Sequence, residues 1–277
     1  MSDTRLDHVA LAVWRWSDAR AALVDRLGGR WLGGVRMPAY NPCQLGYANG
    51  MRVELLEPGT DGGSFLPRFL ARSGAGPHHV TFKVDDIRVA IGRARDAGLQ
   101  IVGEHFDHPA WQEAFLHPRS TGVGFVIQLA QAQLNPAAAM AAAPNSVSAD
   151  EAGLSQPAGA DGAPAQESAA IPFLSAAVPD LDDATALLTE VLHGQAGAAS
   201  SHEGTRLRTV AWQDDTARIV LTQIEPDGQA TPEPAGIRAL AATAVADPGF
   251  AADSQVSGWS VSPVIPELGI RLLTKTR

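Results

Sequence analysis

A repeated unit in the first half of the chain constrains the possible folds more than any other feature of the sequence. The segment DHVALAV (residues 7–13) reappears as HHVTFKV (residues 78–84), and both segments have the alternation typical of a β-strand. Each is followed by an amphipathic stretch that predicts a helix. Strand-like runs then close the two copies at RVELLEP (residues 52–58) and GFVIQLAQ (residues 124–131). The sequence therefore predicts a β-α-β-β-β unit made twice.

Residues at the ends of the two amphipathic stretches support the predicted helices. Ser17, Asp85 and Asp86 have side chains suited to cap a helix N-terminus. Gly28 and Gly98 stand where each stretch ends, and glycine is the usual residue after the last helical turn.

The second half begins with the same unit and ends with a weaker copy. Residues 173–194 (FLSAAVPDLDDATALLTEVLHG) read as a strand and a helix, and the fourth copy opens near residue 237 and closes with GIRLLTKT. We therefore predict an α+β fold of paired βαβββ modules, which form a cupped mixed or antiparallel sheet. Each domain holds two modules, and the second domain is degenerate.

Residues 134–170 consist mainly of Ala, Pro, Gly and Ser and contain few apolar side chains that could form a core. Such a segment cannot bury enough surface to offset its ordering entropy. It predicts a flexible linker between a metal-binding domain (residues 1–133) and a degenerate domain (residues 171–277).

Charge and composition exclude several classes of partner. The net charge is −9, from 30 acidic and 21 basic residues, and the basic residues form no stripe that would attract nucleic acid. Cys43 is the single cysteine, which excludes an intrachain disulfide. The N-terminus lacks a signal-peptide pattern, and no apolar run is long enough to span a bilayer. We expect a cytoplasmic protein with no membrane partner.

Four polar residues occupy matching positions in the two copies of the repeat. His8 and His79 lie in the first strands and Glu54 and Gln128 in the last, at separations of 46 and 49 residues. If the modules pair about a pseudo-twofold axis, these side chains converge on one cavity. Two imidazoles, a carboxylate and an amide oxygen would then hold one divalent ion, which could be Zn, Co, Ni, Mn or Fe.

Taken singly, a histidine in a strand is more often structural than a metal ligand. The repeat changes that comparison, because burying unpaired polar groups costs about 1 to 3 kcal/mol each. Matching inward-facing polar residues in otherwise apolar strands favour a metal site over the structural interpretation.

Several of these motifs, occurring in order, resemble a known family. DHVALAV, VELLEPG, GPHHVTFKVDDI and FLHPRSTGVGFVIQLAQ are similar to the glyoxalase-like, or vicinal oxygen chelate, superfamily and especially to its methylmalonyl-CoA epimerase branch. The resemblance covers Leu6 to Gln131 and implies the ligand set His8, Glu54, His79 and Gln128. It also implies a metal that acts as a Lewis acid on a small substrate with neighbouring oxygens, stabilising an enolate.

The chain departs from that branch at three places. Gln128 stands where the branch usually has a glutamate, HFDHPAWQE (residues 105–113) replaces a Gly- and Lys-rich loop, and YNPCQLGYANG (residues 40–50) lacks the expected carboxylate base. The candidate catalytic residues are therefore Glu54, Gln128 and Glu113. His105, His108 and a metal-bound hydroxide are alternatives as the base. The candidate substrate-binding residues are Trp111, His117, Arg119, Tyr40 and Phe106.

Three functions remain open at this point. A metal-dependent isomerase, epimerase or lyase ranks first. A non-haem iron, extradiol-type dioxygenase ranks second because it uses two histidines and one carboxylate. A non-catalytic small-molecule binding protein ranks third. In the second half Phe173 and Val220 or Thr222 replace His8 and Glu54, which predicts a metal-free copy. That copy would make the chain a monomeric pseudo-dimer, with a homodimer as the alternative.

Overall fold

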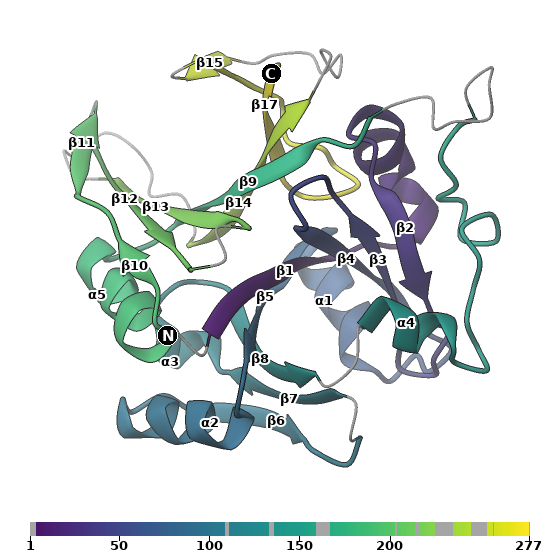
Figure 1. The fold of residues 1–277 in the computed structure, drawn as a ribbon, viewed down its shortest axis with the longest axis horizontal. Coiled ribbons are helices and arrows are strands. Elements are labelled where there is room, and N and C mark those ends of the chain that lie inside the picture. Colours follow the sequence, from purple (N-terminus) through teal and green to yellow (C-terminus); the bar gives the residue numbers. More distant parts are fainter. Residues whose placement is uncertain are drawn as a thin grey trace. The chain divides into compact units, whose positions relative to one another are not determined.

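A computed structural model describes residues 4–108, 111–132, 136–158, 167–202, 204–213, 216–224, 235–244, 254–256 and 258–276 (Figure 1). The elements form two sheets and a small number of helices. The first sheet has the strand order β2-β3-β4-β1-β5-β8-β7-β6, and the second has the order β10-β12-β13-β9-β14-β17-β16-β15, with β11 paired to β12. The predicted α+β class is confirmed.

The first module contains four strands and an irregular helix. Its strands are β1 (Thr4–Ala12), β2 (Arg30–Gly34), β3 (Tyr40–Gly46) and β4 (Arg52–Pro58). The helix consists of a 3-10 turn, Trp16–Ala19, and a π-helical stretch, Arg20–Arg26. Strand β1 pairs in parallel with β4, whereas β3 is antiparallel to both β2 and β4. Helix α1 (Phe65–Ser73) follows the module.

The second module repeats this arrangement. Its strands are β5 (Gly76–Val84), β6 (Ile101–His105), β7 (Trp111–Leu116) and β8 (Val126–Ala132), and its helices are α2 (Ile87–Asp96) and the short α3 (Pro118–Thr121). Strand β5 is parallel to β8, and β7 is antiparallel to β6 and β8. Helix α2 packs on β6, β7 and β8 (Figure 1), and its buried residues are Ile87, Ala90, Ile91 and Ala94.

The third and fourth modules lie in the second sheet. The third contains β9 (Ala170–Ala177), α5 (Leu181–Ala186), a π-helical stretch (Leu187–Val191), β10 (Gln195–Ala196), β11 (Ser200–His202), β12 (Thr205–Ala211) and β13 (Arg218–Ile224). The fourth contains β14 (Gly236–Ala244), β15 (Ser254–Val256), β16 (Trp259–Val261) and β17 (Arg271–Thr276). The faint fourth copy in the sequence therefore corresponds to a set of strands.

The helix ends agree with the sequence at most positions. Asp86 accepts hydrogen bonds from the backbone N–H groups of Arg88 and Val89 and caps α2, and Gly28 and Gly98 have φ angles of +65° and +76°. Ser17 does not cap the first helix, because that helix already begins at Trp16. There Arg15 holds the N-cap position, and its N–H donates to Asp18 Oδ2 at 3.1 Å.

The chain divides into two compact units. One comprises residues 1–7, 79–133 and 173–239, and the other comprises residues 8–78, 134–172 and 240–277. Thus the first unit holds most of the second and third modules, and the other holds most of the first and fourth. Each unit combines residues from both halves of the sequence.

Part of the segment predicted to be a linker packs on the first module. Helix α4 (Pro136–Ala141) is followed by residues that hydrogen-bond to the β2 region, including Val147 N–H to the Gly34 carbonyl at 2.9 Å. Leu154 is fully buried, and Gln156 Nε2 donates to the Gly28 carbonyl at 2.9 Å. Residues 133–135 and 159–166 lie outside the described residues. Whether the segment is flexible stays a prediction.

Candidate metal centre

His8 and Glu54 are brought to one face of the sheet by the pairing of β1 with β4. Ala10 is the partner of Glu54 in this parallel register, and His8 lies two residues earlier on the same face as Ala10. His8 Nε2 lies 3.6 Å from Glu54 Oε2. His8 is 1% exposed and Glu54 is 8% exposed. The strand register therefore buries a carboxylate directly beside an imidazole.

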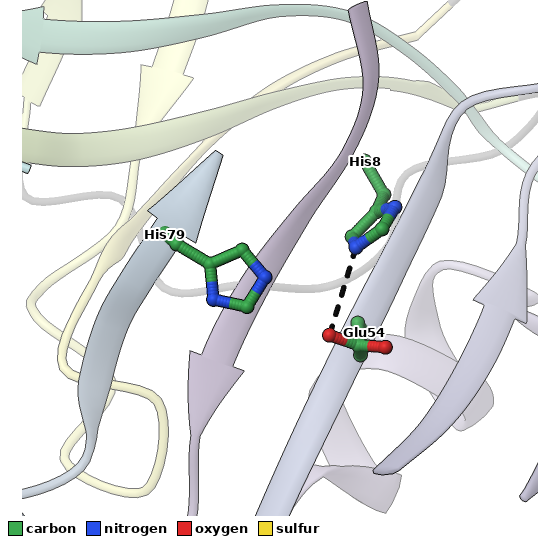
Figure 2. Close-up of side chains that lie close together, drawn as sticks. All are labelled: His8, Glu54 and His79. Atoms are coloured by element: carbon green, nitrogen blue, oxygen red, sulfur yellow. Dashed lines mark ion pairs between the residues drawn. The ribbon is translucent and has the colours of Figure 1, made fainter. Parts of the chain in front are cut away.

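His79 completes the group, as Figure 2 shows. The potential ligand atoms of His8, Glu54 and His79 all lie within 4.8 Å of one another, and all three residues are buried. Two imidazole nitrogens and a carboxylate oxygen form a donor set suited to a divalent transition ion. A cation would also offset the cost of burying the Glu54 carboxylate, so the residues present fit a bound metal ion.

The register of the strand pairs shows that the sequence equivalences hold in three dimensions. His8 pairs with Arg52, two residues before Glu54, and His79 pairs with Val126, two residues before Gln128. The third module repeats this relation. There Phe173 pairs with Arg218 and Ser175 with Val220, so Phe173 and Val220 occupy the positions of His8 and Glu54. The absence of metal binding by the second half remains a prediction.

A second polar layer contacts Glu54 from β3. Gln44, which is 1% exposed and lies opposite Glu54, donates from Nε2 to Glu54 Oε1 at 3.5 Å. Arg52 Nη1 in turn donates to Gln44 Oε1 at 3.3 Å. Such partners orient a ligand carboxylate and limit its rotation. Gln44 thus holds the Glu54 carboxylate from β3, the strand in which the sequence contains no carboxylate that could act as a base.

On the second module, Gln128 belongs to a hydrogen-bonded chain. Its amide oxygen accepts from the Thr81 hydroxyl, and its Nε2 donates to Glu113 Oε2 at 2.7 Å. Trp111 Nε1 donates to the same carboxylate oxygen at 2.7 Å. The alternation of β5 places Thr81 on the same strand face as His79. Hydrogen bonds therefore link Gln128 and Glu113, two candidate catalytic residues, to the candidate substrate-binding residue Trp111.

An aromatic cluster lies on α1 and the adjoining strands. The ring centroids of Tyr40 and Phe65 are 5.6 Å apart, and His78 lies 5.1 Å from the centroids of both Phe65 and Phe69. Burial lowers the pKa of His78 from 6.5 to about 4, against the opposing effect of the Glu54 carboxylate. His78 is therefore a neutral ring at neutral pH.

The remaining predicted residues have local contacts. The guanidinium carbon of Arg88 lies over the Phe106 ring, 4.7 Å from the ring centroid. The backbone carbonyl of Phe106 accepts a hydrogen bond from Gln112 Nε2. His117 caps α3 by accepting from Arg119 N–H at 3.2 Å, and Arg119 is exposed. The alternative bases His105 and His108 are exposed as well. The described contacts thus connect Trp111, but neither His117 nor Arg119, with a candidate ligand.

Sequence reasoning missed several residues at this site. Thr81 could have been found, because it lies two residues after His79 in an alternating strand. Gln44 depends on the register of β3 against β4, and the positions of Phe65 and Phe69 depend on how α1 packs. Neither register nor packing can be obtained from a single sequence.

The buried cysteine adds no ligand to the group. Cys43 is fully buried, and burial together with the nearby Glu54 and Glu57 carboxylates raises the pKa of its thiol. The thiol therefore stays protonated.

Comparison with known proteins agrees with this fold. Residues 7–115 match the family described as the Glyoxalase/Bleomycin resistance protein/Dioxygenase superfamily. Mitochondrial methylmalonyl-CoA epimerase from Bos taurus is 35% identical over 133 residues, which are 46% of this chain and 74% of that protein. Ethylmalonyl-CoA/methylmalonyl-CoA epimerase from Cereibacter sphaeroides is 30% identical over 132 residues, which are 46% of this chain and 97% of that protein.

A solved structure extends the comparison to the whole chain. A variant of 4-hydroxymandelate synthase from Streptomyces coelicolor has a TM-score of 0.66 at 14% identity and covers 100% of this chain and 94% of that one. This likeness shows the fold alone. The chain belongs to the glyoxalase/bleomycin resistance/dioxygenase superfamily. Within it, the first half falls in the methylmalonyl-CoA epimerase-like branch, as the sequence motifs predicted. Among the described helices, none has the length and apolarity needed to cross a membrane.

Proposed function

We propose that this protein is a divalent-metal-dependent isomerase or epimerase, or a lyase of related chemistry, that acts on a small substrate with neighbouring oxygen atoms. The observation that carries this proposal is the buried group of His8, Glu54 and His79, with ligand atoms within 4.8 Å of one another. The relatives matched by the first half are named as epimerases of acyl-CoA thioesters. Their chemistry supports a substrate with an acidic C–H next to a carbonyl.

The chain's residues supply binding, orientation and proton transfer in this proposal. His8, Glu54 and His79 would hold the ion and Gln128 would be the fourth ligand, while Gln44 orients the Glu54 carboxylate. A divalent ion bound there supplies a Lewis acid that stabilises negative charge developing on a substrate oxygen. Trp111 and Tyr40 would form the walls that receive the substrate. Proton transfer requires a base. The sequence suggested Glu113, His105, His108 or a metal-bound hydroxide for that role.

Metal analysis combined with proton exchange tests the proposal. The purified chain, stripped with a chelator and titrated with Co²⁺, should bind about one equivalent, and His8→Ala should abolish binding. His117→Ala is the matched control, because His117 caps a surface turn and should leave Co²⁺ binding unchanged. The loaded protein should catalyse exchange of the C2 proton of methylmalonyl-CoA in D2O. Metal uptake that is equal in the wild type and His8→Ala would contradict the proposal.

The donor set favours one second candidate. Two histidines and one carboxylate are also the ligands of non-haem iron dioxygenases. Such an enzyme would require Fe²⁺, consume O2 and cleave a catechol, whereas an epimerase would exchange a C–H proton without O2. However, in those enzymes the carboxylate usually belongs to the module of the second histidine, and Glu54 belongs to the module of His8. Oxygen uptake with catechols in the Fe²⁺-loaded protein would select this alternative.

A further inference from the structure

Glu113 accepts two hydrogen bonds through a single carboxylate oxygen. Gln128 Nε2 and Trp111 Nε1 both lie 2.7 Å from Glu113 Oε2. In the register of β7 and β8, Phe115 pairs with Gln128 and Glu113 pairs with Ala130. Glu113 and Gln128 are therefore diagonal neighbours on one face of the sheet, close enough for side-chain contact.

The chemistry of the carboxylate determines which way the Gln128 amide faces. The indole N–H of Trp111 can only donate, so Glu113 Oε2 acts as an acceptor, and the Gln128 group that faces this oxygen is its NH2. The amide oxygen must then point to the other side, where it accepts from the Thr81 hydroxyl. A carbonyl oxygen has two lone pairs, so one remains available for a cation. Thr81 shares its strand face with His79, a member of the candidate ligand group.

We propose that Glu113 is a positioning residue that fixes the Gln128 amide with its oxygen presented as the fourth metal ligand. This inference rests on the proposed function, and it replaces the role of base that the sequence suggested for Glu113. A freely rotating amide would present its NH2 group to the cation for part of the time, which weakens binding. Glu113 prevents that rotation and holds the indole of Trp111 in the same network.

Two substitutions separate positioning from base chemistry. Glu113→Gln removes the charge, but its side-chain carbonyl can still accept from Gln128 Nε2 and Trp111 Nε1. Glu113→Leu removes the acceptor altogether. If Glu113 positions Gln128, Glu113→Leu should weaken Co²⁺ binding by about 10- to 100-fold, as loss of a partner that orients a ligand does. Glu113→Gln should bind Co²⁺ within about threefold of the wild type and retain proton exchange.

A measurement without metal tests the geometry directly. In protein labelled with 15N-glutamine, the side-chain NH2 signals of Gln128, assigned through their loss in Gln128→Leu, should show slow hydrogen exchange. That protection should persist in Glu113→Gln and disappear in Glu113→Leu. Glu104→Gln and Glu104→Leu are the matched controls, because Glu104 lies on the adjacent strand β6 and pairs with Arg95 at the surface.

The Co²⁺ binding and amide exchange results together distinguish failure of the proposed function from failure of the positioning role. If the wild-type chain takes up no Co²⁺, the metal-dependent function fails, and so does the ligand part of this inference. The amide exchange then still decides whether Glu113 orients Gln128. If the wild type binds Co²⁺ but Glu113→Leu binds it equally well, the proposed function stands and the positioning role is overturned. The positioning role would also be overturned if Glu113→Gln lost as much Co²⁺ affinity as Glu113→Leu.

Discussion

At the scale of single residues, the candidate centre depends on side-chain alternation within paired strands. His8, Ala10 and Ala12 lie on one face of β1, and the small side chains of Ala10 and Ala12 are fully buried. Leu66 and Leu70 of α1 and Leu56 of β4 pack against these alanines and form an apolar core beside the polar group. The low polarity of these surroundings strengthens electrostatic attraction between the ligands and a cation.

We expect Glu54→Gln to weaken divalent-metal binding by at least about 10-fold, because it removes the one carboxylate of the His8–Glu54–His79 group. The amide oxygen that replaces it is a weaker, neutral ligand. Isothermal titration with Zn²⁺ and Co²⁺ would measure the change. Glu104→Gln removes a charge from a surface ion pair and serves as control. Equal affinities for the two variants would exclude Glu54 as a ligand.

Trp111 is expected to contact the substrate. Its indole is half-buried and held by Glu113, so it offers a rigid, wide surface at a low entropic cost. Trp111→Ala should weaken binding of a ring-containing substrate analogue by about fivefold, since an aromatic contact contributes about 1 kcal/mol. Fluorescence titration with the analogue would measure the change in affinity. Trp14→Ala is the control, because Trp14 is 51% exposed. Unchanged binding by Trp111→Ala would assign Trp111 to loop packing.

The sequence located the candidate ligands better than the residues that contact them. His8, Glu54 and His79 were found because the repeat places them at matching positions, and the structure brings them together. The links from Glu54 to Gln44 and from Gln128 to Glu113 and Thr81 were not found. These links depend on which residues lie opposite one another in β3–β4, β5–β8 and β7–β8, and a one-residue shift in register would change them all.

At the scale of elements, hydrophobic periodicity and caps predicted strands and helices well. The first and last strands are parallel in each of the first three modules, and among the described residues the third module has five strands where the first two have four. Asp180 caps α5 by accepting from Asp182 and Asp183 N–H, as Asp86 does in α2. The π-helical widening at Arg20–Arg26 has no sequence signal that we can identify.

The adjacent residues Asp85 and Asp86 allow a direct test of the α2 cap. Asp86→Ala should lower the free energy of unfolding by about 1 kcal/mol, because it removes two hydrogen bonds to the helix N-terminus. Asp85 is exposed and lies 3.9 Å from Arg5, a surface ion pair of small effect. Asp85→Ala should therefore change stability by less than half as much. Urea denaturation would measure both. Equal effects would show that the cap contributes little.

At the scale of the whole molecule, each compact unit takes residues from both halves of the sequence. In one unit, Phe82 of the second module packs against Trp212 of the third with centroids 4.9 Å apart, and Arg93 Nε donates to the Val191 carbonyl at 2.6 Å. In the other unit, Asn49 exchanges two hydrogen bonds with Ile171 at 2.9 and 3.0 Å. Composition predicted two halves joined by a tether, and these long-range contacts could not be read from it.

Limited proteolysis tests the tether that composition predicted. Residues 134–170 contain no lysine or arginine, so trypsin cannot cut there, and a protease that cleaves after alanine suits this Ala-rich segment. We expect early cleavage between Leu134 and Ala170, with residues 145–147 protected by their hydrogen bonds to Gly34 and Arg36. Mass spectrometry of the first fragments would locate the sites. The tether prediction would be wrong if the first cuts fell elsewhere in the chain.

Separation of the two halves should expose apolar surface that the intact chain covers. Phe82 is fully buried and Trp212 is 3% exposed in the intact chain. A fragment of residues 1–133 lacks Trp212 and would expose the Phe82 ring, at a cost of about 1.5 to 3 kcal/mol for that side chain alone. The fragment should therefore self-associate in sedimentation experiments, whereas the intact chain should not.

Co-expression of the two halves provides the reciprocal test. Residues 1–133 and 171–277, produced as separate chains, should copurify as a 1:1 complex, because the contacts of Phe82 with Trp212 and of Arg93 with Val191 need no covalent link. The complex should bind one equivalent of metal, since the candidate ligands His8, Glu54 and His79 all precede residue 134. If the fragment of residues 1–133 were a stable monomer that did not bind residues 171–277, the pseudo-dimer prediction would be wrong. The second half would then need a role other than covering the first.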